Sequence, residues 1–284
     1  MSVSHAPPDT SLPPPLPPSL ERVVPLGSRR SWSPRWLRRA WGPVLLLVAW
    51  QVASATGVLR PDTLGSPGSM AATARDMLAD GTLPSAMLVS VRRVAVGLLV
   101  GVVAGTGLAL VSGLSRLGED LLDATVQMLR SIPWVGAIPL FIIWLGIGEA
   151  PKIALIALGV AFHLYLNVYA GIRGVDPQLV EAGGSLGLGR WGLVRHVVLP
   201  GALPGAMTGL RYALATAWLA LVFGEQINAD DGIGFLMNQA REFLRTDVIV
   251  VCLVVYAVLG LVADFIVRSL ERLMLQWRPT FTGQ

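Results

Sequence analysis

The chain has 284 residues, of which 53% are hydrophobic and only 14% are charged. A soluble domain carries roughly 25% charged residues, so this deficit and a mean hydropathy of +0.62 exclude an ordinary soluble protein and predict a membrane protein. The net charge is +4, and almost all of the basic residues are arginines. We attribute it to arginines in cytoplasmic loops and not to a nucleic-acid site. The single cysteine, Cys252, allows no intrachain disulfide and is expected to be a packing residue.

The first 41 residues differ in composition from the rest. Residues 1–41 hold many prolines, followed by arginines interleaved with tryptophans. Such a composition predicts a disordered or polyproline cytoplasmic tail that ends in a membrane-interface anchor. Arg29-Arg30 and Ala53-Ser54-Ala55 also resemble parts of a cleaved signal peptide, but the length of the tail and the later apolar runs disfavour cleavage. We therefore predict a tail over 1–41 and a transmembrane domain over 42–284.

Six apolar stretches approach the about 20 residues that a helix needs to cross a bilayer. We predict spans at residues 42–59, 94–113, 132–148, 153–171, 206–224 and 248–268. The third is short and contains Pro133 and Pro139, so we expect it to be bent or partly re-entrant. With the N-terminus inside, the inside segments, which include Arg130, hold roughly twice as many basic residues as the outside segments. This distribution favours cytoplasmic N- and C-termini.

The second predicted span carries small residues at every fourth position. They are Gly97, Gly101, Gly105, Ala109 and Gly113. This spacing places them along one face of a helix, where another helix backbone can approach closely in lipid. We predict tight helix packing along this face, with sliding during gating as a functional addition.

The segment 172–205, between the fourth and fifth spans, is predicted to be a long cytoplasmic loop. Pro177 is typical of the first turn of a helix, and the small residues that follow predict a short helix ending in the region of Gly187 or Gly189. Glu181 lies near the middle of this helix. Leu199-Pro200 is predicted to mark a turn before the fifth span.

This loop resembles the EAA motif of binding-protein-dependent ABC permeases. The family pattern is Glu-Ala-Ala, three residues, Gly, nine residues, Ile, one residue and Leu-Pro. The matching residues here are Glu181, Ala182, Gly183, Gly187, Val197, Leu199 and Pro200. Gly183 and Val197 depart from the pattern by replacing an alanine and the isoleucine. Glycine weakens a short helix by up to about 1 kcal/mol relative to alanine.

The resemblance covers roughly residues 60–280. It is closest to the aliphatic-sulfonate permease branch, near the nitrate and taurine permeases, especially at residues 231–235 and 238–244. It implies an all-α, six-helix, type I importer fold of the MetI-like kind, assembled as a homodimer in the bacterial cytoplasmic membrane. The implied solute is an aliphatic sulfonate or a related organosulfur anion. Nitrate, taurine or another small solute is the alternative, and an ion-coupled secondary transporter is the rival class.

The resemblance also implies two partner proteins. A cytoplasmic ABC ATPase would grip the loop helix around Glu181, and an extracytoplasmic solute-binding protein would dock on the opposite face. ATP binding would close the ATPase pair and turn the cavity outward through the loop. Glu181 would either contact the ATPase or fix the loop internally, and the sequence leaves both roles open.

The chain is not expected to be an enzyme. A phosphate-binding P-loop needs Gly-Lys-Ser/Thr, but the sole lysine, Lys152, lies between Pro151 and Ile153. We expect no cofactor in this chain, and we expect ATP and Mg²⁺ to bind the partner ATPase. Ser185 lies in a G-x-S-x-G pattern that also occurs in hydrolases, but no predicted strand precedes it, so we expect it to be inert. The three histidines have no metal-site spacing.

Four polar residues are candidates for the solute pathway. Arg92 and Arg93 fall at the predicted outer mouth of span two, where they would help an anion to enter or would be ordinary interfacial arginines. His163 and Asn167 share one face of span four, where they would line the pathway or form interhelical hydrogen bonds.

Two further groups of charged residues flank the last spans. Glu225, Asp230 and Asp231 are predicted to lie outside after span five, where they would meet the binding protein or be solvated. Asp264 and Arg268 are four residues apart near the inner end of span six. We expect them to neutralise each other as an ion pair.

Overall fold

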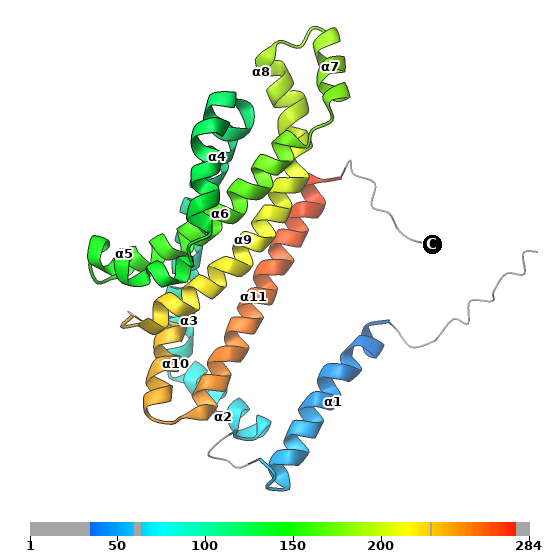
Figure 1. The fold of residues 1–284 in the computed structure, drawn as a ribbon. Coiled ribbons are helices and arrows are strands. Elements are labelled where there is room, and N and C mark those ends of the chain that lie inside the picture. Colours follow the sequence, from blue (N-terminus) through cyan, green and yellow to red (C-terminus); the bar gives the residue numbers. More distant parts are fainter. Residues whose placement is uncertain (1–34, 60–63, 228, 277–284) are drawn as a thin grey trace, which may run out of the picture. The chain divides into compact units, whose positions relative to one another are not determined.

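The apolar runs of this sequence form long helices. The computed structural model describes residues 35–59, 64–227 and 229–276, and it contains no strand within these ranges. The chain divides into two units, Met1–Leu46 and Leu47–Gln284, and the second holds the helix bundle (Figure 1). In chain order the helices are α1 (Arg35–Ala55), α2 (Pro67–Ala79), α3 (Thr82–Leu114), α4 (Arg116–Arg130), η2 (Trp134–Ala137), α5 (Ile138–Leu145), α6 (Glu149–Arg173), α7 (Pro177–Ser185), α8 (Arg190–Leu193), η3 (Val194–Val198), α9 (Leu199–Ile227), α10 (Ile233–Glu242) and α11 (Thr246–Met274).

Four helices of the described chain are long and apolar enough to cross a membrane. They are α3, α6, α11 and the continuous helix Arg190–Ile227, and they contain the predicted spans two, four, five and six. Helix α3 begins at Thr82, well before the predicted start at residue 94. The side chain of Asp80 accepts hydrogen bonds from the Thr82 N–H at 2.8 Å and from its hydroxyl at 2.6 Å, which caps this early start.

The prolines indicated a bend, and the chain bends at the start of the third predicted span. Arg116–Arg130 and Trp134–Leu145 meet at 89°, and they form one broken span at most. Pro133 has no N–H and restricts the residue before it, so the helix cannot continue through this point. Arg130, which the sequence assigned to an inside segment between spans, is the last residue of helix α4. Ser115 caps this helix by accepting the Gly118 N–H at 2.9 Å.

The first predicted span lies in α1, which begins at Arg35, inside the region predicted as a tail. Its apolar part, Val44–Ala55, is shorter than a span. The described chain thus has four spans, or five with the bent pair, and the count of six stays a prediction. The proline-rich residues 1–34 lie outside the described ranges.

Helix α6 packs against α3 along the stripe of small residues. A Cβ at Gly97 would lie 2.6 Å from Ile156 Cβ, and one at Gly105 would lie 2.4 Å from the carbonyl oxygen of Ala161. Contacts shorter than van der Waals distance show that only glycine fits at these positions. The predicted tight packing is confirmed, and the two helices run parallel because later residues of α3 meet later residues of α6.

The other face of α6 packs against α9 through a second set of glycines. A Cβ at Gly205 would lie 2.7 Å from the carbonyl oxygen of Asn167, and one at Gly209 would lie 2.8 Å from Asn167 Cβ. Helix α9 runs antiparallel to α6, because Gly171 meets Ala202 near the end of one helix and the start of the other. Helix α6 is therefore the centre of the bundle, held by close backbone packing on both sides.

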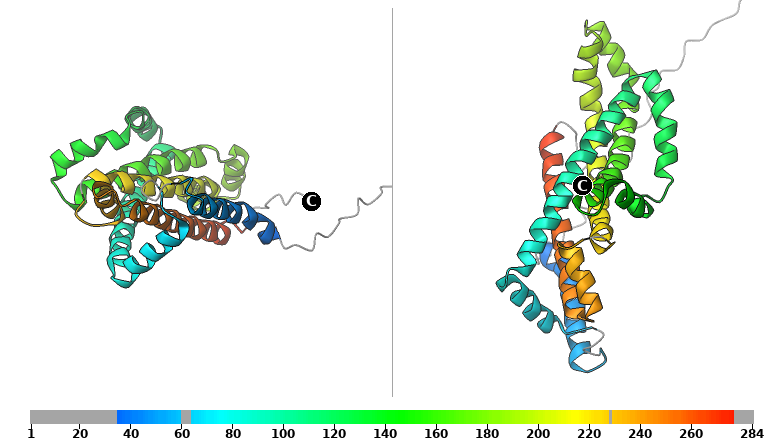
Figure 2. Two further views of the ribbon diagram at one scale, coloured as in Figure 1. Left: turned by 90° about the horizontal axis from the view of Figure 1, so that it is seen from below. Right: turned by 90° about the vertical axis from the view of Figure 1, so that its left-hand side faces the viewer.

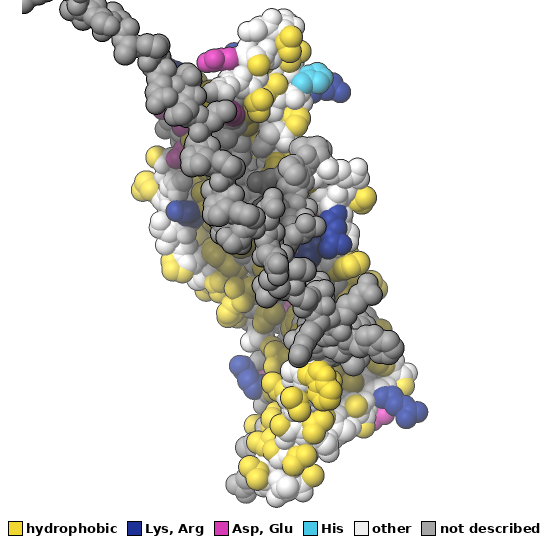
Figure 3. All heavy atoms as spheres, turned by 90° about the vertical axis from the view of Figure 1, so that its right-hand side faces the viewer, with side chains coloured by type: hydrophobic (Ala, Val, Ile, Leu, Met, Phe, Trp, Pro, Cys, Tyr) yellow, Lys and Arg dark blue, Asp and Glu magenta, His cyan; other side chains and the backbone are white. Residues whose placement is uncertain are grey.

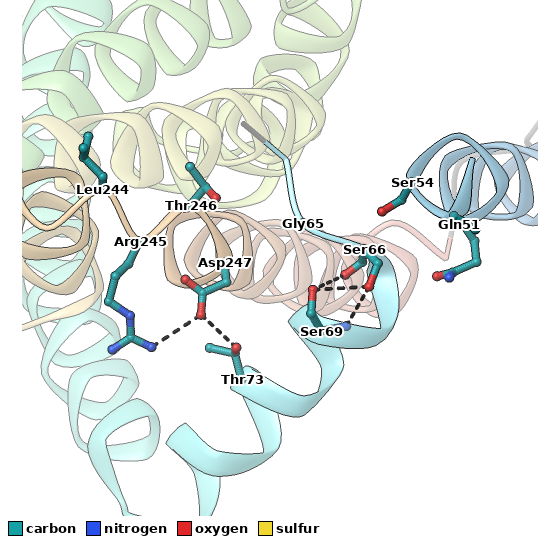
Figure 4. Close-up of a pocket in the computed structure, with 11 residues that line it drawn as sticks. Gln51, Ser54, Gly65, Ser66, Ser69, Thr73, Leu244, Arg245, Thr246 and Asp247 are labelled. Carbon is teal, nitrogen blue, oxygen red and sulfur yellow. Dashed lines mark hydrogen bonds and ion pairs between the residues drawn. The ribbon is translucent and has the colours of Figure 1, made fainter. Parts of the chain in front are cut away.

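A second core joins α2, α10 and α11. Its buried side chains include Met70, Met77, Ile233 and Cys252. Cys252 is fully buried, which confirms its expected packing role. The hydroxyl of Thr73 in α2 donates a hydrogen bond to Oδ2 of Asp247, at the start of α11, at 2.8 Å (Figure 4). This bond holds α2 against α11.

The bundle has two distinct ends. Figures 1 and 2 show α7 and α8 at one end, and α2 and α10 at the other. Between the ends, many large hydrophobic side chains are exposed, including Leu99, Ile143 and Phe265. Figure 3 shows groups of yellow hydrophobic side chains exposed on one face, as expected for a surface that contacts lipid or a partner helix.

Candidate functional site

The predicted loop helix is present as α7, and local signals define both of its ends. Asp176 accepts the N–H of Gln178 at 2.9 Å, and Pro177 occupies the first turn. After Ser185 the chain turns at Gly187, whose φ of +86° is costly for residues with a side chain. The chain then enters α8, so that α7 and the helix beginning at α8 form a hairpin.

Residues of the motif face each other across this hairpin. Gly183 is buried, and a Cβ there would lie 2.8 Å from Leu193 Cδ2 and 3.4 Å from Val197 Cγ2. The two departures from the family pattern, Gly183 and Val197, are therefore neighbours in space. A glycine in the first position lets the two arms approach more closely than an alanine would.

Leu199 and Pro200 do not form the turn that the sequence predicted. They continue a helix that runs from Arg190 to Ile227. The preceding segment, η3, is a π-helix, and the Leu199 N–H bonds to the carbonyl of Val194, five residues back. Pro200 has no N–H to donate. The wide π turn accommodates this missing donor, so the helix passes through the proline without breaking.

The surface of the hairpin combines one acidic group with exposed apolar groups. Glu181 is exposed, and its carboxylate has no hydrogen bond or ion pair within the described residues. Leu186 and Trp191 are 85% and 82% exposed. Clustered exposed apolar side chains are typical of a protein contact surface. The exposed Glu181 carboxylate favours an external partner over a role in fixing the loop.

The hydrolase alternative finds no support in this geometry. The Ser185 hydroxyl donates to the carbonyl of Glu181 at 3.0 Å, which is a backbone contact within α7. A hydrolase elbow needs a strand before the serine, and α7 follows α6 through a short turn. The described residues also hold no group of three or more His, Cys, Asp or Glu side chains placed to bind a metal.

His163 and Asn167 bond mainly within their own helix. His163 Nδ1 lies 2.8 Å from the carbonyl oxygen of Gly159, and Asn167 donates to the carbonyl of His163 at 2.8 Å. The expected interhelical bond is limited to a long contact of 3.4 Å between His163 Nδ1 and Thr216 Oγ1. His163 also lines a cavity of about 280 Å³ beside the bend at Trp134.

Arg93 is not an interfacial arginine. Because α3 begins at Thr82, Arg93 lies inside the bundle and is 1% exposed. Its Nη1 donates to Glu225 Oε1 at 2.7 Å, its Nε donates to Glu149 Oε2 at 2.8 Å, and its Nη2 contacts Asp231. Arg92, the preceding residue, is exposed.

Glu225 is the buried acidic partner in this ion cluster, which we define as Ser90, Arg93, Glu149, Lys152, Glu225, Asp231 and Tyr256. Glu225 lies within α9, which continues to Ile227, and its side chain is buried, so the alternative that it is solvated is wrong. Its carboxylate accepts from Ser90 at 2.7 Å, from the Gly234 N–H at 2.8 Å and from Tyr256 at 3.1 Å. Lys152 donates to Glu149 at 2.9 Å. The cluster therefore joins α3, α6, α9, α10 and α11.

Two ion pairs stabilise the opposite end of the bundle, near the hairpin. Arg268 Nε lies 2.6 Å from Asp264 Oδ2, which confirms the predicted pair. Arg211 pairs with Glu271, so that the start of α9 is tied to the end of α11.

The sequence of this chain is similar to those of known transport proteins. Residues 97–276 match the family described as the binding-protein-dependent transport system inner membrane component. The chain is 46% identical over 236 residues to the putative aliphatic sulfonates transport permease protein SsuC of Escherichia coli strain K12, covering 83% of this chain and 90% of that protein. It is 35% identical over 198 residues to the taurine transport system permease protein TauC of the same strain, covering 70% of this chain and 72% of that protein.

The fold also resembles that of a solved transporter. The inward-facing MetNI methionine ABC transporter matches with a TM-score of 0.50 and 23% identity, covering 63% of this chain and 92% of that one. This confirms the all-helical, MetI-like fold. A permease component is a transport subunit and not an enzyme, and its long apolar helices make it a multi-pass membrane protein. The chain belongs to the family of binding-protein-dependent transport system inner membrane components.

Proposed function

We propose that this chain is the permease subunit of an ATP-driven importer, and that it translocates an aliphatic sulfonate or a related organosulfur anion by alternating access. The observation that carries the proposal is the 46% identity to a sulfonate permease over 90% of that relative. The taurine relative supports the alternative of another small solute. Family membership decides against an ion-coupled carrier, because the family depends on a binding protein.

The proposed contact for the ATPase subunit is the α7–α8 hairpin. Its residues are Glu181, Ala182, Gly183, Gly187, Leu199 and Pro200. The exposed Glu181 and Trp191 support this role, since they offer a charged and an apolar group to a partner. The chain itself holds no cofactor in this proposal, and ATP and Mg²⁺ bind the ATPase.

We further propose the assembly and its orientation. Two copies form a homodimer in the bacterial cytoplasmic membrane, with residues 172–205, the tail 1–41 and both termini in the cytoplasm. The hairpin and the ion cluster lie at opposite ends of the bundle (Figure 1). The ion cluster would therefore face the extracytoplasmic side, where the solute-binding protein docks.

The helix Arg190–Ile227 is suited to carry motion between these ends. It has 38 residues, which corresponds to about 57 Å at 1.5 Å per residue. Its first turns belong to the hairpin, and Glu225 near its last turn belongs to the ion cluster. A movement of the hairpin would therefore reach the far end of the bundle through one continuous element.

Arg92, Arg93, His163 and Asn167 remain our candidates for the solute pathway. The cavity beside His163 supports its inclusion. Arg93 already donates to three carboxylate side chains, so it would reach a solute only if the ion cluster opened.

The test uses the permease reconstituted in proteoliposomes with its ATPase and binding protein. ATP-dependent uptake of labelled ethanesulfonate, in competition with taurine and nitrate, measures the solute. Glu181→Lys should lower uptake by about tenfold or more, as expected for the loss of an interface contact of about 1.4 kcal/mol. Asp120→Lys is the matched control, because Asp120 is also an exposed acidic residue and lies outside the hairpin. Uptake without ATP, or full uptake by Glu181→Lys, would count against the proposal.

A further inference from the structure

The bend between α4 and α5 places Arg130, whose side chain is exposed, at the level of the middle of α6. Helix α4 runs antiparallel to α6, because Tyr169 donates to Glu119 at 2.6 Å and Tyr165 donates to Asp123 at 3.1 Å. Later residues of α4 therefore lie beside earlier residues of α6, closer to the centre of that helix. Arg130, at the end of α4, shares a cavity with residues 159–166 of α6.

The depth of this position follows from helix geometry. Helix α6 has 25 residues, which corresponds to about 37 Å at 1.5 Å per residue. Its residues 159–166 begin about 15 Å from its first residue, so they lie near the middle of a span. The sequence alone assigned Arg130 to a cytoplasmic surface, where an arginine requires no explanation. At mid-depth an arginine is costly and marks a functional site by default.

Arg130 has no acidic partner in the part of the chain that the structure describes. The nearest preceding carboxylate on α4 is that of Asp123, which accepts from Tyr165. The neighbouring Ser131 hydroxyl donates to the carbonyl of Gln127 at 3.1 Å, so its proton is already engaged. The guanidinium of Arg130 is exposed and has no acceptor among the described residues, so its N–H donors are available to a ligand.

The lining of the cavity combines one cationic side chain with several apolar ones. Arg130 supplies the charge, while Trp134, Phe162 and Leu166 supply apolar surface, and His163 completes the lining. Its volume is about 280 Å³, slightly below the roughly 300–1,000 Å³ of pockets for drug-sized ligands. This size suits a small solute.

We infer that this cavity is a transit site for small organic anions within the permease. The planar guanidinium of Arg130 binds the oxygens of the anionic head through paired N–H donors, as arginine does with carboxylate and phosphate. Trp134, Phe162 and Leu166 contact the short apolar part of the solute. The inference rests on the proposed function for its solute class, since an aliphatic sulfonate has one charged head and one apolar tail.

Two other cationic positions do not offer the same chemistry. The larger cavity of about 690 Å³ at the start of α11 contains Arg245, but this side chain lies 3.4 Å from Asp247 (Figure 4). Arg93 is held by three carboxylates in the ion cluster. An anion at either position would have to displace a carboxylate, whereas Arg130 requires no such displacement.

The test compares Arg130→Gln with Arg116→Gln in the reconstituted complex of permease, ATPase and binding protein. Arg116 is an exposed arginine at the other end of the same helix and serves as the control. Arg130→Gln should lower ethanesulfonate uptake by about tenfold or more, the effect of losing a contact of about 1.4 kcal/mol. ATP hydrolysis stimulated by the loaded binding protein should stay at the wild-type rate. Arg130→Lys should keep part of the uptake, because it retains the charge without the planar fork.

A direct binding measurement separates this inference from the proposed function. Equilibrium dialysis measures the binding of labelled ethanesulfonate to the permease–ATPase complex without the binding protein. The wild-type complex should bind ethanesulfonate, and the Arg130→Gln complex should not. Ethanol, which has no anionic head, should not compete with the bound ethanesulfonate. Binding by wild type without ATP-driven uptake would refute the proposed function and leave the site standing. Full uptake by Arg130→Gln would overturn the site, and so would a parallel loss of stimulated ATP hydrolysis.

Discussion

Replacing Arg93 by methionine tests whether the ion cluster holds the helix bundle together. The guanidinium is 1% exposed and the Glu225 side chain is fully buried, so the substitution leaves a buried carboxylate without its charge partner. Breaking a buried pair in this way costs about 3–5 kcal/mol. Glu149 and Asp231 are 52% and 58% exposed, so water can solvate them after the change. Most of the cost should therefore come from Glu225.

This cost predicts a large change in thermal stability. A domain of 150–250 residues loses about 2–4 °C in Tm per kcal/mol, so Arg93→Met should unfold about 6–20 °C below wild type in detergent. Thermal unfolding of the purified protein measures the shift. Arg92→Met is the matched control, because this neighbouring arginine is exposed and surface substitutions usually stay within about 0.5 kcal/mol.

A double variant tests the stated cause. Arg93→Met combined with Glu225→Gln removes both buried charges, while the amide oxygen still accepts from Ser90 and Tyr256. Since neutral replacements of a buried ion pair are often tolerated, the double variant should recover most of the lost stability. A double variant as unstable as Arg93→Met, or an Arg93→Met protein with wild-type stability, would refute the reasoning.

Three further predictions concern Gly105 of α3 and two residues of the hairpin, Gly187 and Ser185. Gly105→Ala should impair folding and lower Tm, because its Cβ would lie 2.4 Å from a backbone oxygen of α6, whereas Gly107→Ala on the same helix meets no atom within 4 Å and should not. Gly187→Ala should destabilise the hairpin by about 1–2 kcal/mol, which is the cost of a left-handed residue with a Cβ. Limited proteolysis should then cut the hairpin faster than in wild type. Gly184→Ala is the control, because a Cβ at Gly184 would meet no atom within 4 Å and should cause no faster cleavage. Ser185→Ala should keep wild-type uptake, and a loss of uptake would contradict the structural role assigned to its hydroxyl.

The sequence by itself determined the features that depend on local or periodic signals. Long apolar runs determined four membrane helices, and the four-residue repeat of Gly97 and its neighbours determined a packing face. The hairpin was predictable because Pro177 and Gly187 act within their own turns. The bend was predictable because Pro133 lacks a donor wherever it stands.

Only the tertiary structure decided where the charged residues lie. Arg93, Glu149 and Glu225 come from three helices far apart in the chain, and no local pattern records that their side chains meet. Arg130 was assigned to a segment between spans because the polar residues of α4 hide that α4 pairs with α5 across the bend. Helix periodicity fixes which residues share a face, but packing decides what that face meets. For this reason the bundle could be read from the sequence, whereas the ion cluster and the anion cavity could not.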